Sequence, residues 1–305
     1  MIRDVIRLLP KPIEEFVQTF SQFELDKLEE IRLRVGQVIE CLFTTGPIYS
    51  TKSPYVFSED DAAFFLNQLS QYSMYAFEEE MQKGYITISG GHRIGLSGKT
   101  ILENGVVKTI RPVSSFNIRI ARQKLGAALK VASELYDKRK GWLNTLIIGP
   151  PQTGKTTVLR DLARIISTGS ENVHSYKVAI VDERSEIAGS MNGVPQHHLG
   201  TRVDVLDGCP KAEGMMMMIR SMSPDVLVVD EIGREADAVA IMEARHAGVA
   251  IMATAHGRTY EEIAKRPVFR ELFQSMAFER VIELGRTPCP GSVKRIRLTK
   301  QVVLA

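Results

Sequence analysis

The pattern of apolar and polar positions divides the chain near residue 122. Before this point apolar residues recur at helical spacing over residues 1–30, and again from Ser58 toward Met81 with an end at Gly84. Short alternating or apolar runs predict strands at residues 30–36, 38–43, 85–89, 92–96, 106–110 and 116–120. We therefore predict a smaller α+β domain over residues 1–122.

The second part of the chain alternates strands with helices. Apolar or alternating runs predict strands at residues 143–148, 178–181, 226–229, 249–253, 280–284 and 293–299. Helical patterns separate most of these strands, which favours a mostly parallel sheet. We predict an α/β domain over residues 141–305. Between the two domains, residues 123–140 indicate a basic hinge and a helix that ends at Gly141.

Composition describes an ordinary globular protein. The 305 residues include 39 Lys and Arg against 36 Asp and Glu, with 44% hydrophobic residues. These values exclude a disordered chain, a collagen-like fibre and a disulfide mini-scaffold. Three cysteines lie far apart, which is typical of reduced thiols in the cytoplasm. No apolar run approaches the roughly 20 residues of a membrane span, so we expect any membrane contact to be peripheral.

The net charge of the chain is close to zero, but two of its segments are basic. Residues 119–140 carry seven Lys and Arg side chains but only two acids. The C-terminal tail carries basic residues and no acid after position 285; these residues are Arg286, Lys294, Arg295, Arg297 and Lys300. Such segments are either solvated faces or surfaces for phosphate groups.

The most specific motif is a phosphate-binding loop of the pattern G-x-x-x-x-G-K-[ST]. A predicted strand precedes it and a helical pattern follows it, as this loop requires. Its glycines let backbone N–H groups converge on phosphate oxygens, and the helix N-terminus favours the same anion. Lys155 supplies charge to the β- and γ-phosphates, and Thr156 offers a hydroxyl to Mg²⁺. The predicted nucleotide-binding residues are Gly149, Pro150, Pro151, Gln152, Thr153, Gly154, Lys155, Thr156 and Thr157.

A second motif completes the first. An apolar strand over residues 225–229 ends in Asp230 and Glu231. Asp230 suits the Mg²⁺ shell, and Glu231 is placed to orient or deprotonate the attacking water. The chain lacks an N-K-x-D tetrapeptide for reading guanine, which favours ATP. The two motifs together predict ATP hydrolysis with Mg²⁺ by an α/β, RecA-like P-loop core, preceded by the smaller α+β domain.

Two other strand ends carry candidate residues. One predicted strand runs into Asp182 and Glu183, and another runs into His256. Because the carboxyl ends of parallel strands face the ligand crevice, these side chains are expected near the nucleotide. Asp182 and Glu183 are therefore rivals of Glu231 for positioning water or metal. His256 is a candidate sensor of the γ-phosphate.

The order of these motifs resembles the type II and type IV secretion ATPases. More closely, nearly the whole chain resembles the stage III sporulation protein AA family of endospore-forming bacteria. The stretches that carry this resemblance are Glu30-Ile-Arg-Leu-Arg, Gly90-Gly-His-Arg-Ile-Gly-Leu, Ile118-Arg-Ile-Ala-Arg, Gly149–Thr157, Val181-Asp-Glu-Arg-Ser-Glu-Ile-Ala and Val229-Asp-Glu-Ile-Gly.

The resemblance implies a hexameric ATPase that is cytoplasmic in the mother cell and peripheral to the membrane around the forespore. There it would energise or assemble a channel with other sporulation channel proteins. Secretion ATPases also hold nucleotide phosphates with arginines that lie between their two domains. Arg111 and Arg119 are the matching residues here, and Arg111 precedes Pro112, which favours an extended backbone.

The sequence departs from the secretion ATPases at one informative place. Their acidic strand usually ends Gly-Glu, whereas this chain has Asp230 before Glu231, so Glu183 and Glu231 both stay open as the base. A nucleic-acid-dependent ATPase is the alternative, because the basic segments could follow a phosphate backbone. The chain shows no recognisable RNA or DNA module, so we expect no nucleic-acid partner. A third hypothesis, a scaffold that binds nucleotide without hydrolysis, conflicts with the intact acidic pair.

Overall fold

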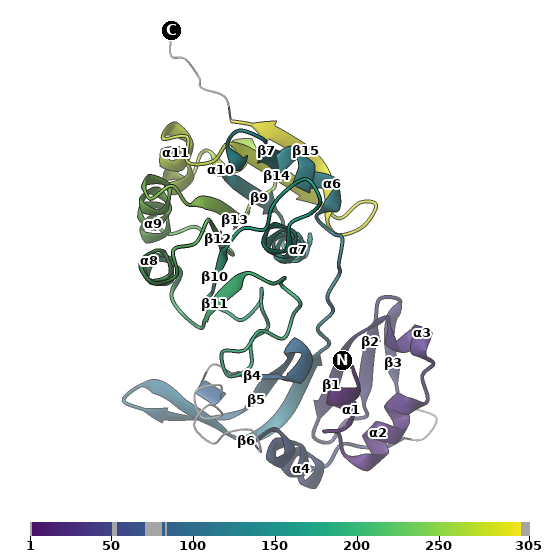
Figure 1. Ribbon diagram of the computed structural model, residues 1–305. Coiled ribbons are helices and arrows are strands. Elements are labelled where there is room, and N and C mark those ends of the chain that lie inside the picture. The colour runs from purple at the N-terminus through teal and green to yellow at the C-terminus, as the bar shows by residue number, and fades with distance from the viewer. Residues whose placement is uncertain (1, 51–53, 71–80, 83, 300–305) are drawn as a thin grey trace. The chain divides into compact units, whose positions relative to one another are not determined.

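The chain forms two compact units, each with its own sheet and core (Figure 1). The computed structural model describes residues 2–50, 54–70, 81–82 and 84–299. The first unit comprises Met1–Arg122 together with Gly189–Asn192, and the second comprises Gln123–Ala188 and Gly193–Ala305.

The first unit is built on a six-stranded antiparallel sheet in the order β3-β2-β1-β6-β5-β4. Its strands are β1 (Leu28–Arg34), β2 (Glu40–Phe43), β3 (Gly46–Tyr49), β4 (Tyr85–Ile88), β5 (His92–Glu103) and β6 (Val106–Arg119). Its helices are α1 (Ile2–Ile6), α2 (Lys11–Gln18), α3 (Gln22–Leu25), α4 (Glu59–Ser70) and the 3₁₀ turn η1 (Ser89–Gly91). The α+β class of this part is therefore as predicted.

The core of this unit is aromatic where α4 crosses the sheet. Phe65 of α4 packs edge-on against Phe116 of β6, with ring centroids 5.1 Å apart, and both rings are buried. Such pairs add about 1 kcal/mol to the burial of their area. The predicted extension of the α4 helix toward Met81 falls largely on residues 71–80, outside the described residues.

The long hairpin of β5 and β6 replaces three shorter predicted strands. The two strands stay paired past Gly98, with register shifts between Ser97 and Thr100, although the apolar alternation weakens there. Backbone pairing thus continues through a stretch whose side chains are mostly exposed. Alternation alone underestimates strand length there, because an exposed ribbon needs no apolar face.

The second unit holds a seven-stranded sheet in the order β11-β10-β12-β13-β9-β14-β15. All neighbouring pairs are parallel except β14 with β15. Its strands are β9 (Thr145–Gly149), β10 (Val178–Asp182), β11 (Val203–Asp207), β12 (Val226–Val229), β13 (Ala250–His256), β14 (Arg280–Gly285) and β15 (Ser292–Leu298). The mostly parallel sheet is as predicted. Only β11, a half-exposed edge strand, lacked a sequence signal strong enough to be predicted.

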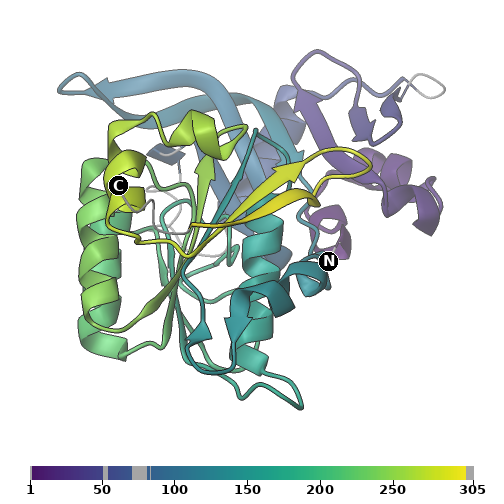
Figure 2. The ribbon, with the colours of Figure 1, turned by 90° about the horizontal axis from the view of Figure 1, so that it is seen from above.

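Helices cover both faces of this sheet, which makes a three-layer α/β unit (Figures 1 and 2). One face carries α7 (Lys155–Thr168), and the other carries α8 (Lys211–Met222), α9 (Glu235–His246), α10 (Tyr260–Ile263) and α11 (Pro267–Gln274). Along β9, Ile147 faces the α7 side while Leu146 and Ile148 face the other. Met215 and Met218 are buried in the second layer, so at least these two of the four consecutive methionines pack the core.

The predicted helix ending at Gly141 is wrong. Helical structure stops at Leu135, after α6 (Leu129–Ala132) and the turn η2 (Ser133–Leu135). A small hairpin of β7 (Tyr136–Asp137) and β8 (Gly141–Trp142) follows. The Asp137 side chain accepts the N–H groups of Arg139 and Lys140 at 2.7 and 3.1 Å, which closes a turn in place of the helix.

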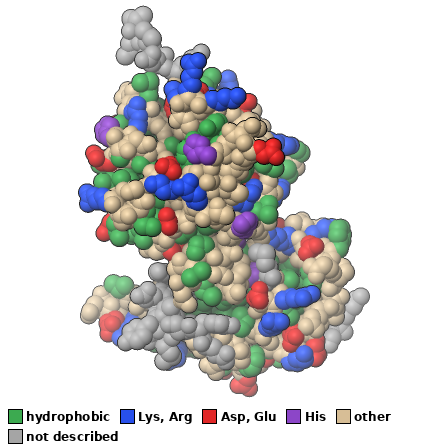
Figure 3. Space-filling model, viewed as in Figure 1, with side chains coloured by type: hydrophobic (Ala, Val, Ile, Leu, Met, Phe, Trp, Pro, Cys, Tyr) green, Lys and Arg blue, Asp and Glu red, His purple; other side chains and the backbone are tan. Residues whose placement is uncertain are grey.

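Charged side chains are interspersed on the face shown in Figure 3, with Lys and Arg next to Asp and Glu. Among the described residues no helix combines the length and the apolar character needed to cross a membrane.

Candidate functional site

The phosphate-binding loop joins β9 to α7, as its strand–loop–helix context predicts. Gly154 has a φ of +81°, and a Cβ at this position would lie 3.0 Å from the backbone nitrogen of Gly291. Glycine is therefore required both by backbone conformation and by space. Helix α7 begins directly after it without a side-chain cap. An uncapped N-terminus leaves its N–H groups and its positive dipole end available to an anion.

The segment between β14 and β15 braces the phosphate-binding loop. The Gly291 N–H donates to the carbonyl of Thr153 at 2.8 Å. The Arg286 guanidinium donates to the carbonyl of Pro151 at 2.7 Å and to Gln152 Oε1 at 2.9 Å. Sequence reasoning placed Arg286 in a basic tail and missed this contact, because the two partners are 135 residues apart.

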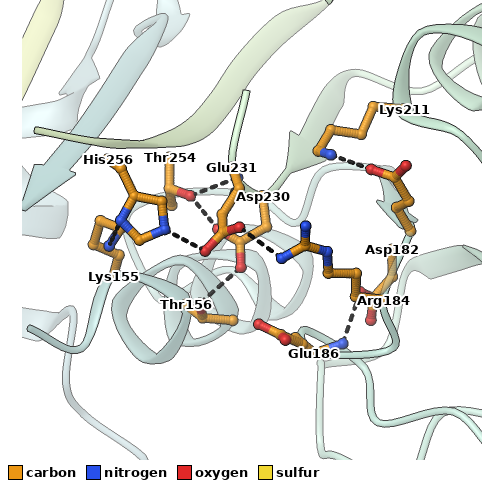
Figure 4. Close-up of polar contacts among 11 residues, drawn as sticks. Lys155, Thr156, Asp182, Arg184, Glu186, Lys211, Asp230, Glu231, Thr254 and His256 are labelled. Atoms are coloured by element: carbon orange, nitrogen blue, oxygen red, sulfur yellow. Dashed lines mark hydrogen bonds and ion pairs between the residues drawn. The ribbon is translucent and has the colours of Figure 1, made fainter. Parts of the chain in front are cut away.

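The side chains predicted to hold phosphate and metal converge across the sheet (Figure 4). The Thr156 hydroxyl donates to Asp230 Oδ2 at 2.7 Å. The Lys155 ammonium donates to the Pro150 carbonyl at 3.2 Å and lies 3.3 Å from His256 Nδ1. Burial lowers the pKa of Lys155, and the nearby Asp230 and Glu231 act in the opposite direction. A hydroxyl and a carboxylate side by side are the oxygen ligands that suit Mg²⁺.

Glu231 is held at its backbone and at both carboxylate oxygens. Its φ is +52°, the left-handed region, and its N–H donates to Thr254 Oγ1 at 2.8 Å. His256 Nε2 lies 2.6 Å from Oε1, and Arg184 donates to Oε2 at 3.1 Å. A non-glycine residue at positive φ is costly and persists where surrounding contacts fix it, commonly at functional sites.

The strand order explains why these groups meet. Strand β13 lies between β9, which leads into the phosphate-binding loop, and β12, which ends before Asp230. His256 at the end of β13 therefore stands between Lys155 and Glu231, and contacts both. Thr254, two residues earlier, hydrogen-bonds Asp230 from the same strand.

The two acids after β10 have different surroundings. Asp182 is buried and accepts the N–H groups of Glu186, Ile187 and Ala188 at 2.8–2.9 Å. Burial raises the pKa of Asp182 to about 6, although these hydrogen bonds oppose the shift. Glu183 instead forms an ion pair with Lys211. Burial alone would raise the pKa of Glu183, but the hydrogen bond and charge of Lys211 lower it below its ordinary value.

A shallow pocket that is open to solvent joins the two strand ends. Its lining residues are Asp182, Glu183, Arg184, Glu186, Lys211, Asp230 and Glu231. The pocket thus brings Asp182 and Glu183 into one site with Asp230 and Glu231, as expected from their places at the carboxyl ends of parallel strands.

Arg111 and Arg119 belong to the other compact unit. Both are exposed on β6 of the first unit, and Arg119 lies 3.9 Å from Glu30. The phosphate-binding loop belongs to the second unit. Contact of these arginines with a nucleotide stays a prediction.

Comparison with known proteins identifies the family of the chain. The family described as sporulation stage III, protein AA, matches residues 2–304. The chain belongs to the stage III sporulation protein AA family. It is 51% identical over 295 residues to stage III sporulation protein AA of Bacillus subtilis (strain 168). The alignment covers 97% of this chain and 94% of that protein. It is also 31% identical over 173 residues to protein SEEDLING PLASTID DEVELOPMENT 1 of Arabidopsis thaliana, which covers 54% of this chain and 24% of that protein.

Solved structures relate this family member to secretion ATPases in fold. The pilus retraction motor PilT, solved with bound ADP, superposes with a TM-score of 0.60 at 15% identity, over 88% of this chain and 76% of that chain. The Legionella pneumophila ATPase DotB superposes with a TM-score of 0.57 at 14% identity, over 84% and 72%. At these identities the likeness shows the fold, and the predicted RecA-like core behind an N-terminal α+β domain is confirmed.

Proposed function

We propose that this member of the stage III sporulation protein AA family hydrolyses ATP to drive a motor or assembly step of a sporulation channel. One observation carries the proposal. Lys155 and Thr156 of the phosphate-binding loop contact His256 and Asp230, which stand at the ends of β13 and immediately after β12. The residues proposed to hold phosphate, metal and water thus converge at the carboxyl edge of a parallel sheet, where such folds bind ligands.

The nucleotide would be held chiefly by the loop from Gly149 to Thr157. Its backbone N–H groups and the start of α7 would face the phosphates, and Lys155 would add a positive charge. Thr156 and Asp230 would hold Mg²⁺, which supplies charge neutralisation on the phosphate oxygens when bound. Both are oxygen donors 2.7 Å apart, so the residues present fit this ion.

Glu231 is the base that the geometry favours over Glu183. Its carboxylate is aligned by contacts on both oxygens, at the end of the strand that leads to Asp230. Glu183 is engaged by Lys211, and its lowered pKa makes it a weak proton acceptor. His256 links Lys155 to Glu231, so it is suited to couple the presence of a γ-phosphate to the position of the base.

The remaining features of the proposal follow the family resemblance. We propose a hexamer that is cytoplasmic in the mother cell, peripheral to the membrane, and partnered with other sporulation channel proteins. Arg111 and Arg119 would reach the phosphates of their own or a neighbouring subunit, with ATP state changing the angle between domains. The ADP that PilT binds supports a nucleotide role for the shared fold.

A nucleic-acid-dependent ATPase gains little support from the basic tail. Arg286 is engaged with the phosphate-binding loop, and Arg297 forms ion pairs with Glu261 and Glu283. On the face shown in Figure 3, basic side chains are interspersed with acidic ones. A backbone-tracking surface would instead concentrate positive charge along one path.

The experiment measures steady-state ATP hydrolysis by purified variants. Lys155→Ala should abolish turnover, and Glu231→Gln should lower kcat at least about a hundredfold while ATP still binds. The matched control Glu183→Gln should stay within about threefold of wild type. Undiminished turnover in Lys155→Ala would refute the proposal. If Glu183→Gln is the slower carboxylate variant, the base is Glu183. Strong stimulation by single-stranded DNA with a steep salt dependence would favour the nucleic-acid alternative.

A further inference from the structure

We propose that Arg184 is a positioning residue that fixes the Glu231 carboxylate for catalysis. The inference rests on the proposed ATPase function, and it concerns a residue that the family motifs leave without a role. Arg184 and Glu231 lie 47 residues apart in the sequence and meet at the shared pocket, with 3.1 Å between guanidinium nitrogen and Oε2 (Figure 4).

The Glu231 carboxylate is contacted at both of its oxygens. A carboxylate held at one oxygen can still rotate about its terminal torsion, which is broad in glutamate. His256 lies 2.6 Å from Oε1 while Arg184 holds Oε2, so the plane of the carboxylate is set from opposite sides. A general base must be held within a fraction of an ångström of its productive position. Arg184 supplies the second of the two contacts that do this.

The loop that carries Arg184 is itself anchored. Asp182 accepts the backbone N–H groups of residues 186–188, and the buried Arg160 donates to the carbonyls of Glu186 and Ile187 at 2.6 Å each. The Ser185 hydroxyl donates to Asp207 at 2.7 Å. Although the Arg184 side chain is 62% exposed, its backbone is thus fixed on both sides.

The charges around the pocket assign Arg184 to Glu231. The neighbouring Glu183 forms an ion pair with Lys211, whose side chain is only 11% exposed. Among the described residues, the ion pair of Arg184 is with Glu231. Exposed pairs of this kind contribute little to folding free energy. We therefore assign the ion pair a role in orienting Glu231, and substitution of Arg184 should leave the free energy of unfolding nearly unchanged.

The test is a set of steady-state and binding measurements on the full chain with ATP and Mg²⁺. Arg184→Ala should lower kcat about tenfold, less than the hundredfold or more that a general base contributes, because His256 still contacts Oε1. KM and the Kd of a fluorescent ATP analogue should stay within about twofold of wild type. Arg184→Lys should recover most of the loss, because it keeps the charge. The matched control is Arg220→Ala, an exposed arginine in the last turn of α8, which should behave as wild type.

A double variant separates positioning from other roles. If Arg184 acts through Glu231, adding Arg184→Ala to Glu231→Gln should cause no further loss of the residual rate. Additive losses would mean that Arg184 acts independently of Glu231, and a Kd for the analogue raised more than about fivefold would mean that Arg184 contacts the nucleotide. Either result would overturn the inference. A wild-type kcat in Arg184→Ala would overturn it while leaving the ATPase function intact. Absence of hydrolysis by the wild type would overturn both.

Discussion

Asp182 and Glu183 are neighbours in the chain, but the fold gives their carboxyl groups opposite electrostatic environments. Asp182 is buried beneath a loop that it holds by three backbone N–H groups, and burial raises its pKa to about 6. Glu183 points the other way to Lys211, and its pKa is lowered. Two carboxyl groups one residue apart therefore have different tasks, one in holding the loop and one in an ion pair.

The raised pKa of Asp182 predicts a pH effect on stability. Because the native state binds this proton more tightly than the unfolded chain, its contribution to the free energy of unfolding falls as pH rises through 4 to 6. We expect the difference in unfolding free energy between wild type and Asp182→Asn to fall by about 1 kcal/mol from pH 5 to pH 7.5. Urea denaturation of both proteins across this range measures it. A constant or rising difference would contradict the assignment, and Asp204→Asn is the exposed control.

Glu231 shows what a residue type alone leaves open. The sequence predicts an acid after an apolar strand, which fits many turns. In the fold this acid has a φ of +52° and both carboxylate oxygens engaged. Its orientation, and not its identity, separates it from Glu183 as a base.

At the scale of elements, the hairpin of β14 and β15 packs against the phosphate-binding loop. The chain from Gly285 to Gly291 lies against the loop and supplies both a backbone N–H and the Arg286 guanidinium. The loop also carries Gln152 at a positive φ of +61°. Such a backbone needs outside contacts to keep its shape, and the hairpin provides them.

This contact gives a prediction for nucleotide binding. Arg286→Ala should raise the KM for ATP about three- to tenfold with little change in kcat, because a lost hydrogen-bonding charge at the loop costs about 1 kcal/mol. Steady-state kinetics with ATP and Mg²⁺ measures both constants. Arg295→Ala, an exposed arginine on the same hairpin, is the control and should not differ from wild type. A loss of kcat at unchanged KM would place Arg286 in the chemical step instead.

At the scale of the whole molecule, the chain combines an antiparallel α+β unit with a RecA-like core. The first unit has one core cluster, and the second has two, one on each face of its sheet. The two arginines singled out for phosphate contact, Arg111 and Arg119, belong to the first unit and the phosphate-binding loop to the second. Contact of these arginines with the nucleotide would therefore be a contact between units, or between subunits, of the proposed motor.

At this scale we predict that binding of ATP and Mg²⁺ promotes assembly of a hexamer. With ATP and Mg²⁺, Glu231→Gln should bind nucleotide without turnover and accumulate as a hexamer, whereas Lys155→Ala should not respond to ATP. Light scattering behind a sizing column gives the mass of each variant with and without nucleotide. A mass of one chain under every condition would contradict a ring motor, and wild type with ADP serves as the matched control.

The sequence by itself determined the features that are local in the chain. The phosphate-binding loop, the acidic strand end and most strands and helices are set by residue types within a few positions of one another, which is the range of hydrophobic periodicity and of backbone turns. The sequence also predicted that the strand ends lie near the nucleotide, but tertiary structure alone decided which side chains contact one another there. The placement of β13 between β9 and β12 put His256 against both Lys155 and Glu231. Strand pairing also joined Arg184 to Glu231 and Arg286 to Pro151, because contacts between distant residues depend on strand order, which local patterns do not encode.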